Sequence, residues 1–229
     1  MHTQIPPLRG VEPAAPPTPA AQDPYRALLL LRYLLVNLTG FALLAVAWQQ
    51  GWVAAVVAGD SSRLVFVIAG VFLFGLLWSA KRAFDLAFEL DQTRAPEPHP
   101  DSFTARFLRD LARAGAARRG QVERALELEL AGDLAPLRHL ASSLVLLGLV
   151  GTVLGFIVAL SGVDPKLAAD VSAIGPMVAR LIEGLGIALY TTLVGTLLNL
   201  WLATVHRLLE GGATKLASRL LRRSAGAFG

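Results

Sequence analysis

Hydrophobic residues are concentrated in four long runs along the chain, and polar segments separate them. The runs cover residues 27–48, 64–80, 144–160 and 184–205. Each is long enough, as a helix, to cross a hydrocarbon layer of about 30 Å, for which roughly 20 apolar residues suffice. The pattern therefore predicts an all-α integral membrane protein with four transmembrane helices and helical extensions into the cytoplasm.

The polar segments divide the chain into five regions. Residues 1–24 are rich in Pro and Ala, which predicts a disordered tail. The regions that follow are a first transmembrane hairpin, a cytoplasmic helical region, a second transmembrane hairpin and a basic amphipathic C-terminal helix, at residues 25–83, 84–139, 140–206 and 207–229. The last region either extends the fourth span or lies on anionic lipid.

The region between the hairpins contains helix start and stop signals. Ala95-Pro-Glu-Pro-His-Pro interrupts a helix that continues from the second span. Asp101 or Ser102 is a suitable N-cap for an amphipathic helix over residues 103–114. Asp133 together with Pro136 predicts the start of the helix that becomes the third span.

Composition agrees with a membrane location. The 229 residues are 54% hydrophobic and the mean hydropathy is positive, which is too apolar for an ordinary soluble domain. The chain has no cysteine and only four histidines, so we expect no metal site and no cofactor. A net charge of +4 is what basic residues beside membrane spans produce, and we expect no nucleic-acid partner.

Basic residues also predict the orientation. They gather beside the spans on one side and include Lys81, Arg82, Arg138, Arg207, Lys215, Arg219, Arg222 and Arg223. Because cytoplasmic loops carry an excess of Lys and Arg, both termini and the central region are predicted to be cytoplasmic. The connections at 49–63 and 163–178 then face outward.

Small and polar residues form one stripe on each helix of the second hairpin. On the third span the stripe contains Gly148, Thr152 and Gly155, with Gly151 completing a G-x-x-x-G pattern with Gly155. The equivalent residues of the fourth span are Thr192, Gly195, Thr196 and Asn199. Small residues let helix backbones approach closely, and polar groups at membrane depth face a bundle interior or a water-filled path. Interhelical hydrogen bonding alone is an equally good explanation of the stripes.

None of the four runs has a carboxylate in its middle. A protein that moves protons through a bilayer needs an ionisable group at depth, so this chain alone is a poor proton carrier. Glu183 lies at the outer end of the fourth run and is a candidate ion entrance. An ion pair with Arg180 at headgroup level explains it equally well.

The hairpin resembles the MotA/TolQ/ExbB proton-channel superfamily. The resemblance rests on Leu-Gly-Leu-Val-Gly-Thr-Val-Leu-Gly-Phe-Ile at 147–157 and Gly-Ile-Ala-Leu-Tyr-Thr-Thr-Leu-Val-Gly at 186–195. Thr152 and Thr192 match the threonines of the two motifs. The residues of the second motif are similar to those of ZorA-like and of ExbB/TolQ-like members. Many ExbB and TolQ members have a glutamate where this chain has Ile187.

The resemblance implies a function that the residues alone do not give. Members form rings of five subunits around a dimer of a single-span partner of the MotB/TolR/ExbD type, whose aspartate titrates. Thr152, Thr192, Thr196 and Asn199 would then line the ion pathway in the bacterial inner membrane. The absence of further carboxylates in the spans favours H⁺ over Na⁺ as the transported ion.

Three functions therefore compete. The first is a subunit of an ion-driven motor or channel. The second is a membrane enzyme, for which the chain offers no convergent set of nucleophile, acid and metal ligands. The third is a non-conducting scaffold that assembles other membrane proteins through G-x-x-x-G packing.

Overall fold

The computed structural model describes residues 24–95, 97–114, 118–163 and 171–228, and these residues form helices and connections without any strand. The helices are α1 (Pro24–Gln49), α2 (Trp52–Gly59), α3 (Leu64–Gln92), α4 (Phe103–Arg113), α5 (Arg119–Ser161) and α6 (Val171–Phe228). The predicted tail at 1–24 lies outside the described residues except for Pro24.

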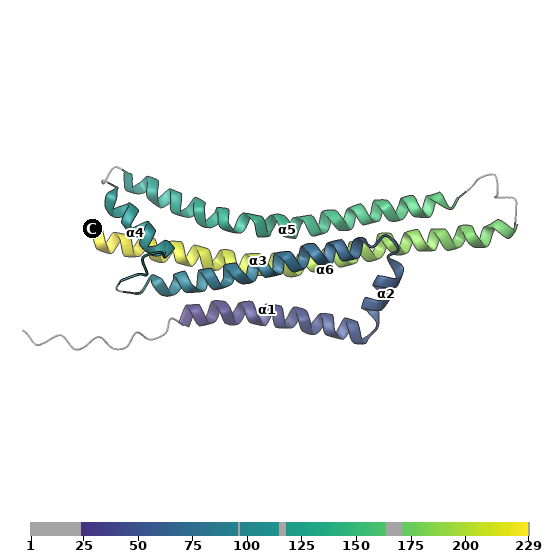
Figure 1. Ribbon diagram of the computed structural model, residues 1–229, viewed down its shortest axis with the longest axis horizontal. Coiled ribbons are helices and arrows are strands. Elements are labelled where there is room, and N and C mark those ends of the chain that lie inside the picture. Colours follow the sequence, from purple (N-terminus) through teal and green to yellow (C-terminus); the bar gives the residue numbers. More distant parts are fainter. Residues whose placement is uncertain (1–23, 96, 115–117, 164–170, 229) are drawn as a thin grey trace, which may run out of the picture.

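Four helices run side by side along the long axis of the molecule (Figure 1). Helix α6 is central and contacts α1, α3 and α5, and its contact with α5 is the most extensive in the fold. Helices α1, α3, α5 and α6 are each long and apolar enough to cross a membrane. The prediction of an all-α membrane protein with four spans is therefore confirmed.

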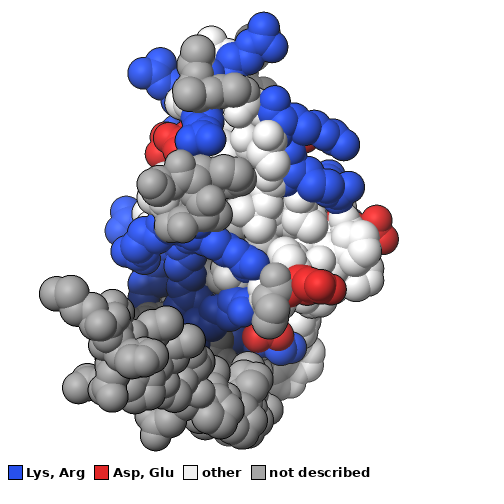
Figure 2. Space-filling view, turned by 90° about the vertical axis from the view of Figure 1, so that its left-hand side faces the viewer, with Lys and Arg blue, Asp and Glu red and all other residues white. Residues whose placement is uncertain are grey.

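The two ends of the bundle differ. The short helix α2 lies at one end, where it joins α1 to α3, and α4 lies at the other, beside the end of α6 (Figure 1). We call the end that holds α4 the basic end, because Lys and Arg dominate its surface (Figure 2). The other is the α2 end.

The helices extend beyond the spans at the basic end, and the hydrophobic core of the bundle continues between them there. Leu137 of α5, Leu209 and Leu216 of α6 and Leu111 of α4 are almost fully buried in it. The run at 207–223 therefore extends the fourth span and buries its apolar face within the chain. Burial of that face against the chain's own helices removes it from contact with lipid.

Two prolines lie inside helices, which the sequence signals did not predict. Pro136 lies within α5, so the expectation that a helix starts there is wrong. Proline removes one backbone donor and crowds the carbonyl four residues earlier, here that of Gly132. Both Gly132 and Pro136 are exposed, so water can solvate that carbonyl, while Leu134 and Leu137 pack into the core. Pro176 likewise lies within α6, in a segment expected to be a connection.

Polar side chains join α1, α3 and α6 inside the bundle. The Tyr33 hydroxyl lies 3.1 Å from the Ser79 hydroxyl, and the indole nitrogen of Trp201 donates to Asn37 at 3.3 Å. The Trp201 ring lies directly against Gly40, where any larger residue would overlap it. In a membrane, interhelical hydrogen bonds and close packing hold helices together, since lipid tails are as apolar as leucine.

Charged side chains hold the basic end together by capping helices. Glu89 accepts hydrogen bonds from the backbone nitrogens of Phe103 and Thr104 at 2.8 and 3.0 Å, and Ser102 caps the same helix through the nitrogen of Ala105. The guanidinium of Arg223 donates to carbonyl oxygens just after α3, including that of Thr93 at 2.8 Å. The prediction of an N-cap at Asp101 or Ser102 is confirmed for Ser102.

Replacing Glu89 with alanine is expected to detach the start of α4. The change removes a carboxylate that accepts from two backbone amides and the Thr104 hydroxyl, at a local cost of about 1–3 kcal/mol. Hydrogen exchange of the α4 amides in detergent should become faster by one to two orders of magnitude. Glu97→Ala is the control, because the Glu97 side chain is exposed and makes no hydrogen bond or ion pair to a described residue. Equal exchange in both variants would contradict the capping role.

Candidate functional site

Helices α5 and α6 approach each other at backbone distance along a row of glycines. A methyl group placed on Gly148 would lie 3.1 Å from the carbonyl oxygen of Thr191 and 3.2 Å from Cα of Thr192. One placed on Gly195 would lie 3.2 Å from Cα of Gly148. These distances are shorter than ordinary contacts of a side-chain carbon, so the two backbones are in direct contact.

The contact continues toward the α2 end. A methyl group on Gly151 would overlap the side chain of Thr191, and one on Gly155 would overlap the backbone of Gly184 and Ala188. The glycines predicted to pack helices are therefore placed inside this one hairpin, between α5 and α6 of the same chain. None of Gly148, Gly151 and Gly155 is exposed on the outer surface.

Thr152 and Thr192 meet across the hairpin, at the edge of the glycine contact. Their hydroxyls are within hydrogen-bond distance of each other. Both also donate toward the carbonyl oxygen of Gly148, at 3.2 Å from Thr152 and 3.1 Å from Thr192. Thr192 is exposed and Thr152 is half-buried. The threonine pair is therefore held in place by the backbone approach at Gly148 and still reaches the outer surface of the hairpin.

Thr196 and Asn199 lie on the same edge of α6 as Thr192. Thr196 is exposed and Asn199 is half-buried, and neither side chain makes a hydrogen bond to any described residue. The leucines next to this edge are exposed as well, including Leu189, Leu193 and Leu200. This face of the hairpin thus presents polar groups among apolar ones to whatever lies beside it.

Thr191 packs between the two helices, a role that the stripe of small and polar residues in the sequence did not predict. It is fully buried, and its hydroxyl donates to the carbonyl oxygen of Ile187 in its own helix at 2.8 Å. A one-residue step turns a helical side chain by about 100°, so Thr191 fills the space opposite Gly151 while Thr192 reaches the edge. The absence of a side chain at Gly151 was the available signal.

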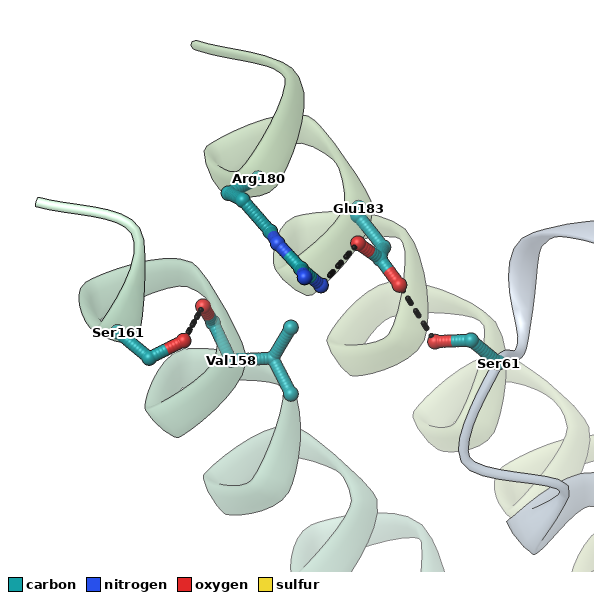
Figure 3. Close-up of polar contacts among 5 residues, drawn as sticks. All are labelled: Ser61, Val158, Ser161, Arg180 and Glu183. Atoms are coloured by element: carbon teal, nitrogen blue, oxygen red, sulfur yellow. Dashed lines mark hydrogen bonds and ion pairs between the residues drawn. The ribbon is translucent and has the colours of Figure 1, made fainter. Parts of the chain in front are cut away.

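Glu183 lies on the opposite side of α6 from Thr192. Nine residues separate them, which corresponds to two and a half turns of an α-helix. One carboxylate oxygen accepts from the Ser61 hydroxyl at 2.8 Å and the other from Arg180 at 3.1 Å (Figure 3). The ion pair with Arg180 expected from the sequence is present. It is largely exposed, and such pairs contribute little to stability.

Within the spans the described residues contain no carboxylate. On α6 the stretch from Glu183 to His206 is free of charged and titratable groups apart from Tyr190, and at 1.5 Å per residue it covers about 33 Å. On α5 the corresponding stretch runs from His139 to Ser161. The threonine pair therefore supplies hydrogen-bonding groups at membrane depth but no group that takes up a proton.

Sequence comparison assigns this arrangement to a known family. The pattern of the MotA/TolQ/ExbB proton channel family matches residues 99–221, just over half of the chain. The chain belongs to this family. The match covers α4, α5 and most of α6, and so includes both membrane spans of the hairpin with the threonine pair. No curated protein and no solved structure matched the chain.

Membership in this family agrees with the four long apolar helices. The protein is a multi-pass membrane protein. Among the described residues no three His, Asp or Glu side chains are grouped closely enough to hold a metal ion. The chemistry that the site offers is hydrogen bonding along an open helix face.

A single methyl group at Gly155 is expected to separate the hairpin. Gly155→Ala places the new atom against the backbone of Gly184 and Ala188, and overpacking of this kind costs about 1–3 kcal/mol. Thermal unfolding in detergent should therefore occur several degrees lower. Gly70→Ala is the matched control in the apolar part of α3, because nothing lies within 4 Å of the added atom and alanine favours a helix. A drop of the same size in both variants would refute the close contact.

Proposed function

We propose that this protein is the ring-forming subunit of a proton-driven motor or channel in the bacterial inner membrane. Five copies would surround a dimer of a single-span partner of the MotB/TolR/ExbD type that carries an aspartate in its span. Proton flow through the complex would be coupled to mechanical work. The observation that carries this proposal is the open polar edge formed by Thr152, Thr192, Thr196 and Asn199 in a hairpin whose two membrane spans contain no carboxylate.

Because the spans lack a carboxylate, the proposal assigns different roles to this chain and to its partner. A proton at membrane depth needs a titratable carrier, usually Asp, Glu or His, and the four spans contain none of these three. The threonine hydroxyls supply hydrogen bonds to water or to a partner's carboxylate, and such bonds favour its charged form. The carrier would thus come from the partner, and this chain would line its path.

The exposed apolar side chains beside the polar edge support assembly with other membrane-spanning helices. Leu189, Leu193 and Leu200 on α6 and Leu149 and Val153 on α5 are all exposed in the single chain. Neighbouring copies, the partner's span and lipid would share these surfaces. The excess of Lys and Arg at the basic end (Figure 2) supports a cytoplasmic location for this end and for both termini, since cytoplasmic segments are enriched in these residues.

The scaffold alternative depends on glycines that are free to bind other proteins. Gly148, Gly151 and Gly155 are instead in contact with α6 of the same chain, so this alternative loses its main support. An enzymatic function is disfavoured by membership in a channel family.

The composition of the native complex tests the assembly. The protein extracted in mild detergent from the cells that produce it is expected to have the mass of several copies plus a small single-span protein with an aspartate in its apolar segment. Native mass spectrometry gives both the stoichiometry and the partner. A monomer or dimer without a partner would refute the motor subunit.

Loss of the Thr192 hydroxyl is expected to slow proton flux. Thr192→Val keeps the shape and removes one hydrogen-bonding group from the polar edge, worth about 1–1.5 kcal/mol, or roughly tenfold in rate. The measurement is proton flux into proteoliposomes that contain the isolated complex. Thr39→Val is the control, because Thr39 is exposed on α1 and bonds only to its own helix. Unchanged flux in Thr192→Val would argue against a pathway along this edge.

A further inference from the structure

A groove lies between α5 and α6 on the side of the threonine pair nearer the basic end. Its volume is about 710 Å³, and only these two helices line it. Its polar and charged lining comprises Glu127, Arg138, His139, Ser142, His206 and Glu210, with Thr214 further along α6. A groove of this size has room for water, and its polar side chains can form hydrogen bonds with that water.

The groove continues the polar edge of the hairpin. On α6, His206 and Glu210 follow Thr192 by 14 and 18 residues, and these separations bring the side chains back to within about 40° of the same direction. Asn199 lies between Thr192 and His206 on the same edge. On α5, Arg138 is related to Thr152 by the same 14-residue separation. Polar groups therefore follow one line from the threonine pair to the groove, over about 21 Å on α6.

His206 is the first titratable side chain on this line after the threonine pair. Its side chain is 12% exposed, and its Nδ1 lies 4.0 Å from a carboxylate oxygen of Glu210. The other charged or titratable groups that line the groove come from α5 and are Glu127, Arg138 and His139. Histidine is the side chain whose charge ordinarily changes between pH 5 and 8. An imidazole that lines this groove and is still partly exposed is thus placed to exchange a proton with water.

We propose that the α5–α6 groove is the proton-release site of this protein and that His206 is its proton acceptor. The inference rests on the proposed proton-channel function and assigns the end of the path. A proton leaving the span through water binds to the free imidazole nitrogen, and the ring gains one positive charge that Glu210 stabilises. The proton then passes to water in the groove, and the imidazole returns to its neutral form.

The first test asks whether the groove is open to water. This experiment can be done without the partner protein. The chain has no cysteine, so a single cysteine is the only site for a membrane-impermeant thiol reagent. His206→Cys is expected to react rapidly when the reagent is added on the side of the basic end, and at least tenfold more slowly from the other side. Leu202→Cys is the matched control one turn away, because Leu202 is fully buried, and it should stay unlabelled. An unreactive His206→Cys in a protein of normal yield and size would overturn the proposal.

The second test measures proton flux in proteoliposomes that contain the isolated native complex, with the pH on the side of the basic end varied from 5.5 to 8. His206→Gln is expected to lower the flux about tenfold and to flatten its dependence on that pH. His99→Gln is the control, since His99 is exposed in the α3–α4 connection, and it should behave as wild type.

Chemical rescue separates proton transfer from a merely structural role. Flux through His206→Ala is expected to recover when imidazole is added on the side of the basic end, because the groove is large enough to admit it. Wild-type pH dependence in His206→Gln, or a loss of flux that imidazole does not restore, would overturn the assignment. If the wild-type complex itself conducts no protons, the proposed channel function fails, which the wild-type measurement reveals separately.

Discussion

The backbone contact between α5 and α6 is the interaction on which the rest of the hairpin depends. Lipid tails provide no hydrophobic drive for helices to associate, so close packing and hydrogen bonds must do so. Gly148, Gly155 and Gly195 allow this approach, because a side chain at Gly155 or Gly195 would overlap the opposite backbone and one at Gly148 would press against it. The same approach presents the Gly148 carbonyl to the hydroxyls of Thr152 and Thr192.

The site follows from the geometry of this contact. A helix pair joined through glycines on one face leaves the neighbouring face open, and on α6 this open face carries Thr192, Thr196 and Asn199. Thr191 satisfies its hydroxyl within its own helix, whereas Thr192, Thr196 and Asn199 lie along the open edge, where water or a partner can reach them.

Outside the spans, the hydrophobic effect and contacts of charged side chains hold the helices together. At the basic end the helices continue into water, where burial of Leu137, Leu209 and Leu216 is driven by the hydrophobic effect. Charged side chains cap helix ends and join helices there, as Arg82 does with Asp133 through two contacts of 3.1 Å. This part anchors the long α6 and fixes the walls of the groove that contains His206.

The sequence by itself determined the four spans, the all-helical class, a helix cap at Asp101 or Ser102 and the stripes of glycines and threonines, because apolar run length and helical period depend on local order alone. Only the tertiary structure decided which face of each helix meets which neighbour. It turned Thr191 inward and Thr192 to the edge, directed Glu183 toward Ser61, and used Trp201 to fill the space over Gly40. It also carried α5 through Pro136, because packing of the residues around it outweighs the loss of one hydrogen bond. A period fixes directions around one helix, whereas the partner of each direction depends on contacts between segments far apart in the chain.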